Sequence, residues 1–395
     1  MRLPKIEKIT RDTTISHFFL MFGYKLFSLY FPLFLVARGF SLPEVGYTYL
    51  LIYLPIALFA PFVGFLNHKI NPVILASFGI LGYAIYALGM ILIRNLALFY
   101  FWQMLLGISA ALFFVSARAI LISSPLENYD RAFGWFYTAP FYAEALAPCI
   151  GALFIWKFNF AGVFILSLIL QLFTAIFCYS QLNRQKIRPL NKFFNFQKFQ
   201  QNYQKVLPRI KGRDVLPSIL ISFSVLLLAG FYFAFFVLFL KDSLSWSQNL
   251  ILVFVSVFSA IFLPISLFLI DRLSKFKSEK NIFQGGLIAG AFSTLFGAAI
   301  PVLNFFNILI INLGKSAGAL MANAGRSGLI SQKLKENPEE AGAIDTIFSP
   351  LGIALGALIS GLLIGFLGYQ LLFILGGVFV VIVGLLCKNL PNSKN

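Results

Sequence analysis

The chain has 395 residues, of which 59% are hydrophobic, 17% aromatic and 11% charged. Soluble domains carry about 25% charged residues, so this composition excludes a soluble enzyme and a nucleic-acid-binding module. A helix that crosses a bilayer needs roughly 20 apolar residues, and the chain is long enough for twelve such helices joined by short loops. The composition therefore predicts a polytopic membrane protein.

Long apolar runs bounded by charge, proline or glycine mark the predicted transmembrane helices. They lie at residues 14–36, 44–66, 73–92, 96–121, 133–156, 161–179, 216–240, 249–270, 282–300, 305–330, 341–366 and 370–387. The first 13 residues are polar, and no small-residue cleavage site follows the first apolar run. This pattern predicts an uncleaved first helix rather than a signal peptide.

The net charge of +17 is explained by topology rather than by a nucleic-acid partner. If the N-terminus is cytoplasmic, 25 Lys and Arg residues fall on the cytoplasmic side of the predicted helices and 4 on the other side. Cytoplasmic loops carry such an excess of basic residues. We therefore expect a multi-pass protein of the plasma (inner) membrane with both termini in the cytoplasm.

A basic linker at residues 181–215 separates the first six predicted helices from the last six. It carries nine Lys and Arg residues and is interleaved with phenylalanine. One interpretation is a helix that lies on the anionic inner leaflet. A flexible linker that its charge keeps in the cytoplasm is the other.

The two parts on either side of the linker repeat each other in sequence. The matched blocks are Arg118–Gly134 with Arg326–Gly342, Pro61–Lys69 with Pro264–Arg272, and Ala147–Pro148 with Ser349–Pro350. Parallel repeats of this kind are typical of internally duplicated transporters. We therefore predict an all-α membrane protein of two pseudo-symmetric six-helix bundles, at residues 1–180 and 216–395.

Three short motifs indicate a family. Residues 64–71, Gly-Phe-Leu-Asn-His-Lys-Ile-Asn, resemble the Gly-x-Leu-x-Asp-Arg-x-Gly loop of the major facilitator superfamily, and residues 269–275 keep its charges better. Residues 147–151, Ala-Pro-Cys-Ile-Gly, are similar to the Gly-Pro-x-x-Gly element of antiporters in that family, which marks Pro148 and Gly151 as hinge candidates. The resemblance implies two bundles around a central cavity that opens alternately to each side.

Three charged residues lie near the middle of predicted helices: Lys25, Glu144 and Lys315. A charge at the bilayer centre costs about 2.5–3.5 kcal/mol on insertion scales, so each should face a cavity or a partner. The resemblance turns the helices of both lysines toward the cavity. One interpretation is that the lysines bind an anionic group of the substrate, one from each bundle. The alternative is a structural ion pair of Glu144 with a lysine.

Polar neighbours extend this candidate site. Tyr24 adjoins Lys25, and Asn312, Ser316 and Asn323 share one helical stripe beside Lys315. Gln103 is either a cavity hydrogen-bonder or a packed amide, and it stands where proton-linked members of the family often carry arginine. Glu144 is the candidate for proton coupling, with a permanently ionised partner of Lys25 as the alternative.

Arg118 and Arg326 occupy equivalent places in the repeat, near the ends of two predicted helices. Their equivalence suggests gating, but side chains that snorkel to water would anchor the helices equally well.

The loop charges suggest a second element of the gate. In the family, the Asp of the loop after the second helix contacts the start of the eleventh helix. Here His68 and Lys69 occupy the Asp-Arg places of that loop, and Asp345 is expected in the first turn of helix 341–366. The resemblance predicts an exchanged pair, with the cation on the loop and the anion on the helix. A solvated loop histidine is the alternative for His68.

The repeat predicts a counterpart of this pair. Asp271 and Arg272 lie in the loop that matches the first one, and Asp271 is expected to pair with Arg131.

Motifs for ATP binding, zinc hydrolysis, serine catalysis and potassium selectivity do not occur in the sequence. We therefore expect a secondary transporter rather than an enzyme, with no cofactor and no metal in its mechanism. The expected partners are a small, possibly anionic or amphipathic solute, the lipid bilayer, and protons or another coupling ion, and the chain is expected to be monomeric. A drug/proton antiporter and a lipid or lysolipid flippase are the alternatives. A membrane enzyme or non-transporting protein is disfavoured by the duplicated halves.

Overall fold

The computed structural model describes residues 5–93, 95–183, 195–212 and 215–388. Within these ranges the secondary structure is helical, and no strand occurs there. The helices are α1 (Lys8–Ser28), α2 (Phe31–Ala37), α3 (Leu42–Lys69), α4 (Pro72–Ile91), α5 (Leu96–Ser123), α6 (Tyr129–Leu182), α7 (Phe196–Ile210), α8 (Leu216–Asp242), α9 (Gln248–Leu273), α10 (Ser278–Ala298), the 3-10 turn η1 (Ile300–Val302), α11 (Phe305–Lys333) and α12 (Pro338–Lys388).

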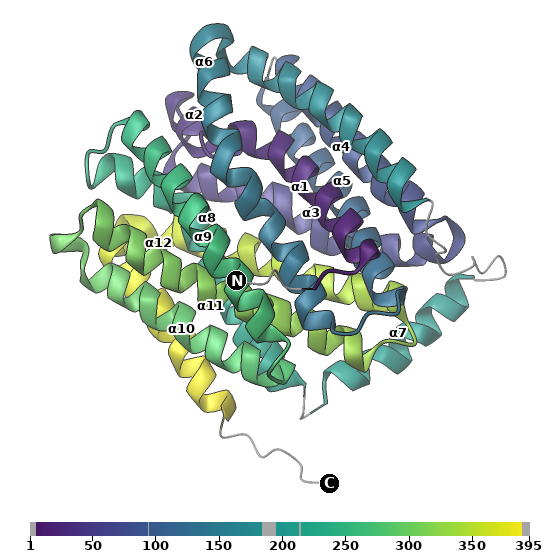
Figure 1. Cartoon of the computed structure of the whole chain (residues 1–395). Helices are drawn as coiled ribbons and strands as arrows, with labels where there is room; N and C mark the ends of the chain where they lie inside the picture. The colour runs from purple at the N-terminus through teal and green to yellow at the C-terminus, as the bar shows by residue number, and fades with distance from the viewer. Residues whose placement is uncertain (1–4, 94, 184–194, 213–214, 389–395) are drawn as a thin grey trace.

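Nine helical stretches of the described chain are long and apolar enough to cross a membrane. Two of them, α6 and α12, run for 54 and 51 residues and contain one non-helical residue each, Asn159 and Gly368. Both residues have positive φ, at 53° and 65°, which asparagine and glycine tolerate better than other residues. The chain turns back on itself at these residues, so α6 and α12 each contribute two arms (Figure 1). The predicted count of twelve crossings stays a prediction.

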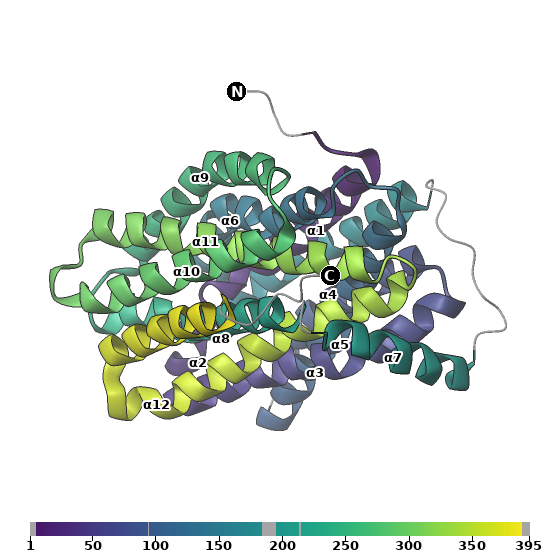
Figure 2. The same cartoon turned by 90° about the horizontal axis from the view of Figure 1, so that it is seen from below.

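The helices gather in two groups that lie side by side (Figure 1). We call α1–α6 the N-terminal half and α8–α12 the C-terminal half. Helix α7 lies at one end of the molecule and α2 at the opposite end in both views (Figure 2). We call these the α7 end and the α2 end. The predicted domain boundaries at residues 180 and 216 stay a prediction.

Helix α7 lies in the predicted linker, of which residues 184–194 and 213–214 are outside the described part of the chain. Its Val206 and Ile210 are buried, whereas Phe196 is exposed. The Phe199 ring lies 5.5 Å from the ring of Phe65 at the end of α3. One face of α7 is therefore packed against the protein, and its contact with lipid stays a prediction.

Helix α1 is held between the two arms of α6 by close backbone approaches. Gly151 on the first arm lies so close to α1 that a Cβ there would stand 1.8 Å from the carbonyl oxygen of Leu26. On the second arm, Gln171 Nε2 donates to the carbonyl of Leu20 at 2.8 Å. This packing brings the middle of α1 against α6. In the structure Gly151 is a contact point, and its predicted role with Pro148 as a hinge stays a prediction.

A substitution at Gly151 tests the importance of this approach. We expect Gly151→Ala to destabilise the protein by about 1–3 kcal/mol, the usual cost of overpacking a tight contact, and to lower the apparent melting temperature in detergent. Gly365→Ala is the matched control, because a Cβ at Gly365 meets no atom within 4 Å. Equal melting temperatures for the two variants would contradict the packing described here.

Candidate functional site

The predicted mid-membrane charges of the N-terminal half form an ion pair. Lys25 Nζ on α1 lies 3.1 Å from Glu144 Oε1 on α6, and the side chains are 10% and 20% exposed. The Lys25 ammonium also lies 5.8 Å from the ring centroid of Phe233, on α8 of the other half. That distance is within the range of a cation–π interaction. Glu144 is therefore paired with Lys25 in the structure, and its predicted role in proton coupling stays a prediction.

Lys315, the third predicted charge, contacts aromatic rings rather than a carboxylate. Lys315 Nζ on α11 lies 3.2 Å from the ring centroid of Tyr232 and 5.9 Å from that of Phe236, both on α8. The ion pairs among the described residues include Lys25 but not Lys315. The site thus contains two cations, one carboxylate and, between the cations, the aromatic run of α8.

Tyrosines of the N-terminal half border this site. The ring of Tyr24 lies edge-on to that of Tyr83 with 5.9 Å between centroids. Tyr53 stacks on Tyr49, and its ring is also 6.3 Å from that of Phe233. The predicted residue Tyr24 therefore belongs to a wall of tyrosines that faces α8, which offers an amphipathic lining of rings with polar tips.

Two predicted substrate-binding residues have other roles in the structure. Gln103 is fully buried in the N-terminal half. It accepts a hydrogen bond from the Tyr86 hydroxyl at 3.2 Å and donates to the carbonyl of Phe99, so it is the packed amide of the two interpretations. Asn323 accepts from Arg326 at 3.1 Å and belongs to a second site described below.

The remaining polar residues of the predicted stripe stay beside Lys315. Asn312 and Ser316 are both buried on α11, and the Asn312 amide donates to the carbonyl of Ile308, one turn earlier.

A second polar site lies near the α7 end, where one carboxylate serves two arginines. Arg118 Nε on α5 donates to Asp345 Oδ2 on α12 at 2.8 Å, and Arg326 Nε on α11 donates to Oδ1 at 3.0 Å. The Arg118 and Asp345 side chains are 4% and 1% exposed, and Arg326 is fully buried. Of the two interpretations of these arginines, snorkelling to water is therefore wrong, because both turn inward to share a buried partner, and their role in gating stays a prediction.

Hydroxyl groups complete the arginine network. The Tyr137 hydroxyl on α6 accepts from Arg118 Nη2 at 3.1 Å and from Arg326 Nη2 at 3.3 Å, and it lies 2.8 Å from the Ser327 hydroxyl. Ser327 in turn donates to Asp345 at 2.6 Å. Arg118 and Tyr137 come from the N-terminal half and the other three from the C-terminal half. The network therefore joins the two halves. We did not predict Tyr137 or Ser327, whose only sequence signal is proximity to Arg131 and Arg326.

The predicted pairing of Asp345 with His68 and Lys69 is wrong. Helix α12 begins at Pro338, so Asp345 lies about two turns inside the helix, at the level of Arg118. His68 Nε2 instead lies 2.9 Å from Oε1 of Glu340, which is in the first turn. Lys69 is exposed, 5.2 Å from the ring of Phe65.

The predicted pair of Arg131 and Asp271 also does not form. Arg131 Nη2 donates to Glu7 at 2.8 Å and to Glu127 at 3.1 Å, both in the N-terminal half. A hydrogen bond from Lys5, together with Arg131, holds the pKa of the exposed Glu127 carboxyl below its usual range. Asp271 pairs with Lys275 at 2.7 Å on the surface.

Two further details complete this end of the molecule. Arg272 lies 5.3 Å from the ring of Phe276. In place of the predicted pair, Asp130 connects α6 to the start of α10. Its carboxylate accepts from Ser278 at 2.8 Å and from Asn281 at 2.9 Å.

A family model of the Major Facilitator Superfamily matches residues 13–337. The chain belongs to the major facilitator superfamily. It is a membrane transporter of that family, and its fold is similar to the crystal structure of the human organic anion transporter MFSD10 (TETRAN). That similarity has a TM-score of 0.72 at 14% sequence identity and covers 96% of this chain and 99% of the other. No curated protein sequence matches the chain.

In this major facilitator protein, Asp345→Asn tests the inter-half network. The variant leaves two buried guanidinium groups without a carboxylate, and breaking a buried pair in this way costs about 3–5 kcal/mol. We expect the α7 end to open. The measurement is maleimide labelling of Ser331→Cys, a buried position on α11, in a background in which Cys149, Cys178 and Cys387 are replaced by serine.

The matched control is Asp271→Asn, which removes an exposed surface carboxylate. We expect faster labelling of the cysteine at position 331 in Asp345→Asn and no change in Asp271→Asn. Equal labelling rates in both variants would contradict the role of Asp345 as the shared partner of the two halves.

Proposed function

We propose that the protein transports a small organic anion by alternating access and that Lys25 and Lys315 bind the anionic group. The observation that carries this proposal is the charge of the mid-membrane site. The site holds two lysines from opposite halves, of which Lys25 pairs with Glu144 and Lys315 lies against Tyr232, so the three charged side chains have a formal charge of +1. Because unbalanced charge in the bilayer is costly, an anion that enters the site removes that cost.

The charge balance also suggests what couples to transport. A monoanion neutralises the site as it stands, with Glu144 ionised. A dianion neutralises it only when Glu144 takes up a proton, and its arrival beside Lys25 weakens the ion pair that favours the ionised carboxylate. We infer that Glu144 is the group that releases Lys25 to the substrate and that holds a proton when the cargo has two negative charges.

In this proposal the arginine network controls whether the α7 end is open or closed. It holds the two halves together at the α7 end, away from the site of the two lysines. The predicted excess of basic residues makes the α7 end cytoplasmic, together with both termini, in a plasma or inner membrane. The described conformation is then the one closed toward the cytoplasm. Breaking the bond between Arg118 and Asp345 opens this end while the α2 end closes.

Aromatic side chains favour an amphipathic anion over an inorganic one. The Phe233 ring contacts both Lys25 and Tyr53 of the tyrosine wall. Rings of this kind bind an apolar body, and the lysines bind its charged group. The similar human structure is an organic anion transporter, which agrees with this choice, although the likeness itself extends to the fold alone.

The test is a thermal-shift measurement on the purified protein, with benzoate and succinate as anions, tetraphenylphosphonium as a cation and lysophosphatidylcholine as a lipid. A ligand at 100 times its dissociation constant adds about 2.7 kcal/mol of apparent stability. We expect stabilisation by an anion and a loss of at least about tenfold in its affinity in Lys315→Ala, equivalent to about 1.4 kcal/mol. Lys241→Ala, an exposed lysine at the α2 end, is the matched control.

Three results would redirect the proposal. Stabilisation by tetraphenylphosphonium alone would favour cation efflux through Glu144. Stabilisation by lysophosphatidylcholine alone would favour lipid transport. An anion effect that is the same in Lys315→Ala and Lys241→Ala would remove Lys315 from the site.

A further inference from the structure

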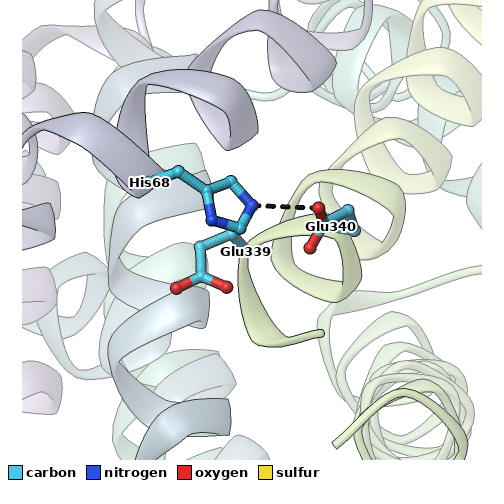
Figure 3. A group of neighbouring side chains, drawn as sticks. All are labelled: His68, Glu339 and Glu340. Atoms are coloured by element: carbon cyan, nitrogen blue, oxygen red, sulfur yellow. Dashed lines mark hydrogen bonds and ion pairs between the residues drawn. The ribbon is translucent and has the colours of Figure 1, made fainter. Parts of the chain in front are cut away.

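A histidine and two glutamates meet at the α7 end, apart from both sites described above. His68 stands at the end of α3, and Glu339 and Glu340 stand in the first turn of α12 (Figure 3). One ligand atom of each residue lies within 4.8 Å of the ligand atoms of the other two. The cluster therefore brings together a ring nitrogen and two carboxylates from opposite halves of the protein.

His68 and Glu340 are in direct contact in this cluster. Their Nε2 and Oε1 atoms are 2.9 Å apart. Ligands of a tetrahedral ion at about 2.1 Å from each donor are about 3.4 Å from one another. An ion bound to both atoms would replace their hydrogen bond and move them about 0.5 Å farther apart, and a carboxylate oxygen of Glu339 lies within 4.8 Å of both.

Glu340 carries an unsatisfied atom in this cluster. Its Oε1 accepts from Asn202 of α7 at 2.7 Å as well as facing His68. Its Oε2 is buried and has no hydrogen-bond partner, in a residue that is 1% exposed. Figure 3 shows this carboxylate facing the other two side chains. A buried carboxylate oxygen without a partner is costly, and a bound cation would supply the missing interaction.

We propose that His68, Glu339 and Glu340 form a binding site for a divalent transition-metal ion of the zinc type. An imidazole with two carboxylates is a donor set that suits zinc and its neighbours in the first row, whereas magnesium and calcium take oxygen ligands. The two ionised carboxylates and a neutral imidazole carry a charge of −2, which one divalent cation balances. Water is available as a fourth ligand, because His68 is 12% exposed.

Such an ion ties α3 of the N-terminal half to α12 of the C-terminal half. Helix α12 also carries Asp345, about one and a half turns farther along the same helix. A metal ion bound at this site therefore keeps the α7 end closed, as the arginine network does. Metal binding then inhibits transport, and this last step alone rests on the proposed function.

Metal binding is tested without any transport assay. Isothermal titration calorimetry of the purified full-length protein in detergent, with zinc chloride as the probe, is expected to show one site. The protein carries serine in place of Cys149, Cys178 and Cys387, so that thiols do not bind the metal. His68→Gln and Glu339→Gln are each expected to weaken zinc binding at least about tenfold, since each removes a ligand. Magnesium chloride is expected to bind far more weakly than zinc.

Asp271→Asn is the matched control, because it removes a surface carboxylate at the same end without touching the cluster. Melting curves of each variant confirm that it is folded before titration. Zinc affinity that is equal in Asp271→Asn, His68→Gln and Glu339→Gln would overturn the site. So would the absence of zinc binding to the parent protein. Zinc binding that leaves anion uptake unchanged would overturn only the inhibitory role.

Discussion

The structure depends on one buried carboxylate that serves two arginines from opposite halves. Asp345 is 1% exposed, and it accepts from both Arg118 and Arg326. The attraction between buried charges is strong only when their geometry is good, and the cost of removing them from water is large. A contact of this kind is therefore either fully made or fully broken and hydrated. That property suits a gate, which needs two stable positions rather than a continuous range.

Two helices connect the gate to the mid-membrane site. On α6, Tyr137 of the network and Glu144 of the site are seven residues apart, which places them on the same face two turns from each other. On α11, Lys315 and Arg326 are eleven residues apart, or about three turns. Each half thus has one helix that carries both a residue of the proposed substrate site and a residue of the proposed gate. A tilt of either helix moves both sites together, which is the coupling that alternating access requires.

The sequence predicted the class of protein and the positions of its important charges, but not their partners. Apolar runs and the internal repeat predicted a helical, internally duplicated membrane protein because hydrophobic burial in lipid is a local property of the chain, and the resemblance of three short motifs added the major facilitator family. Lys25, Glu144 and Lys315 were singled out because a charge in the bilayer is costly unless it faces a cavity or a partner. Their geometry depends on how closely α1, α6 and α8 pack, and the contact of Gly151 with the Leu26 carbonyl has no signature in the sequence beyond a glycine.

The wrong prediction for Asp345 shows most clearly what could not be predicted from the sequence. The family pattern placed it against His68, but α12 begins at Pro338, three residues earlier than the predicted start of that helix. Glu340 therefore takes the position at the level of the loop, and Asp345 faces the buried arginines. A shift of three residues is almost one helical turn, which is enough to exchange one ion-pair partner for another.

The most direct test of this account is a pair of spin-label distances measured by double electron–electron resonance. One pair of labels sits at Lys69 and Lys335 at the α7 end, and the other at Arg38 and Ser247 at the α2 end, all exposed positions. Arg118→Met removes one ion pair between the halves and leaves Asp345 paired with Arg326. The account predicts that the α7-end distance lengthens while the α2-end distance shortens. Unchanged distances, or a change in the same direction at both ends, would contradict it.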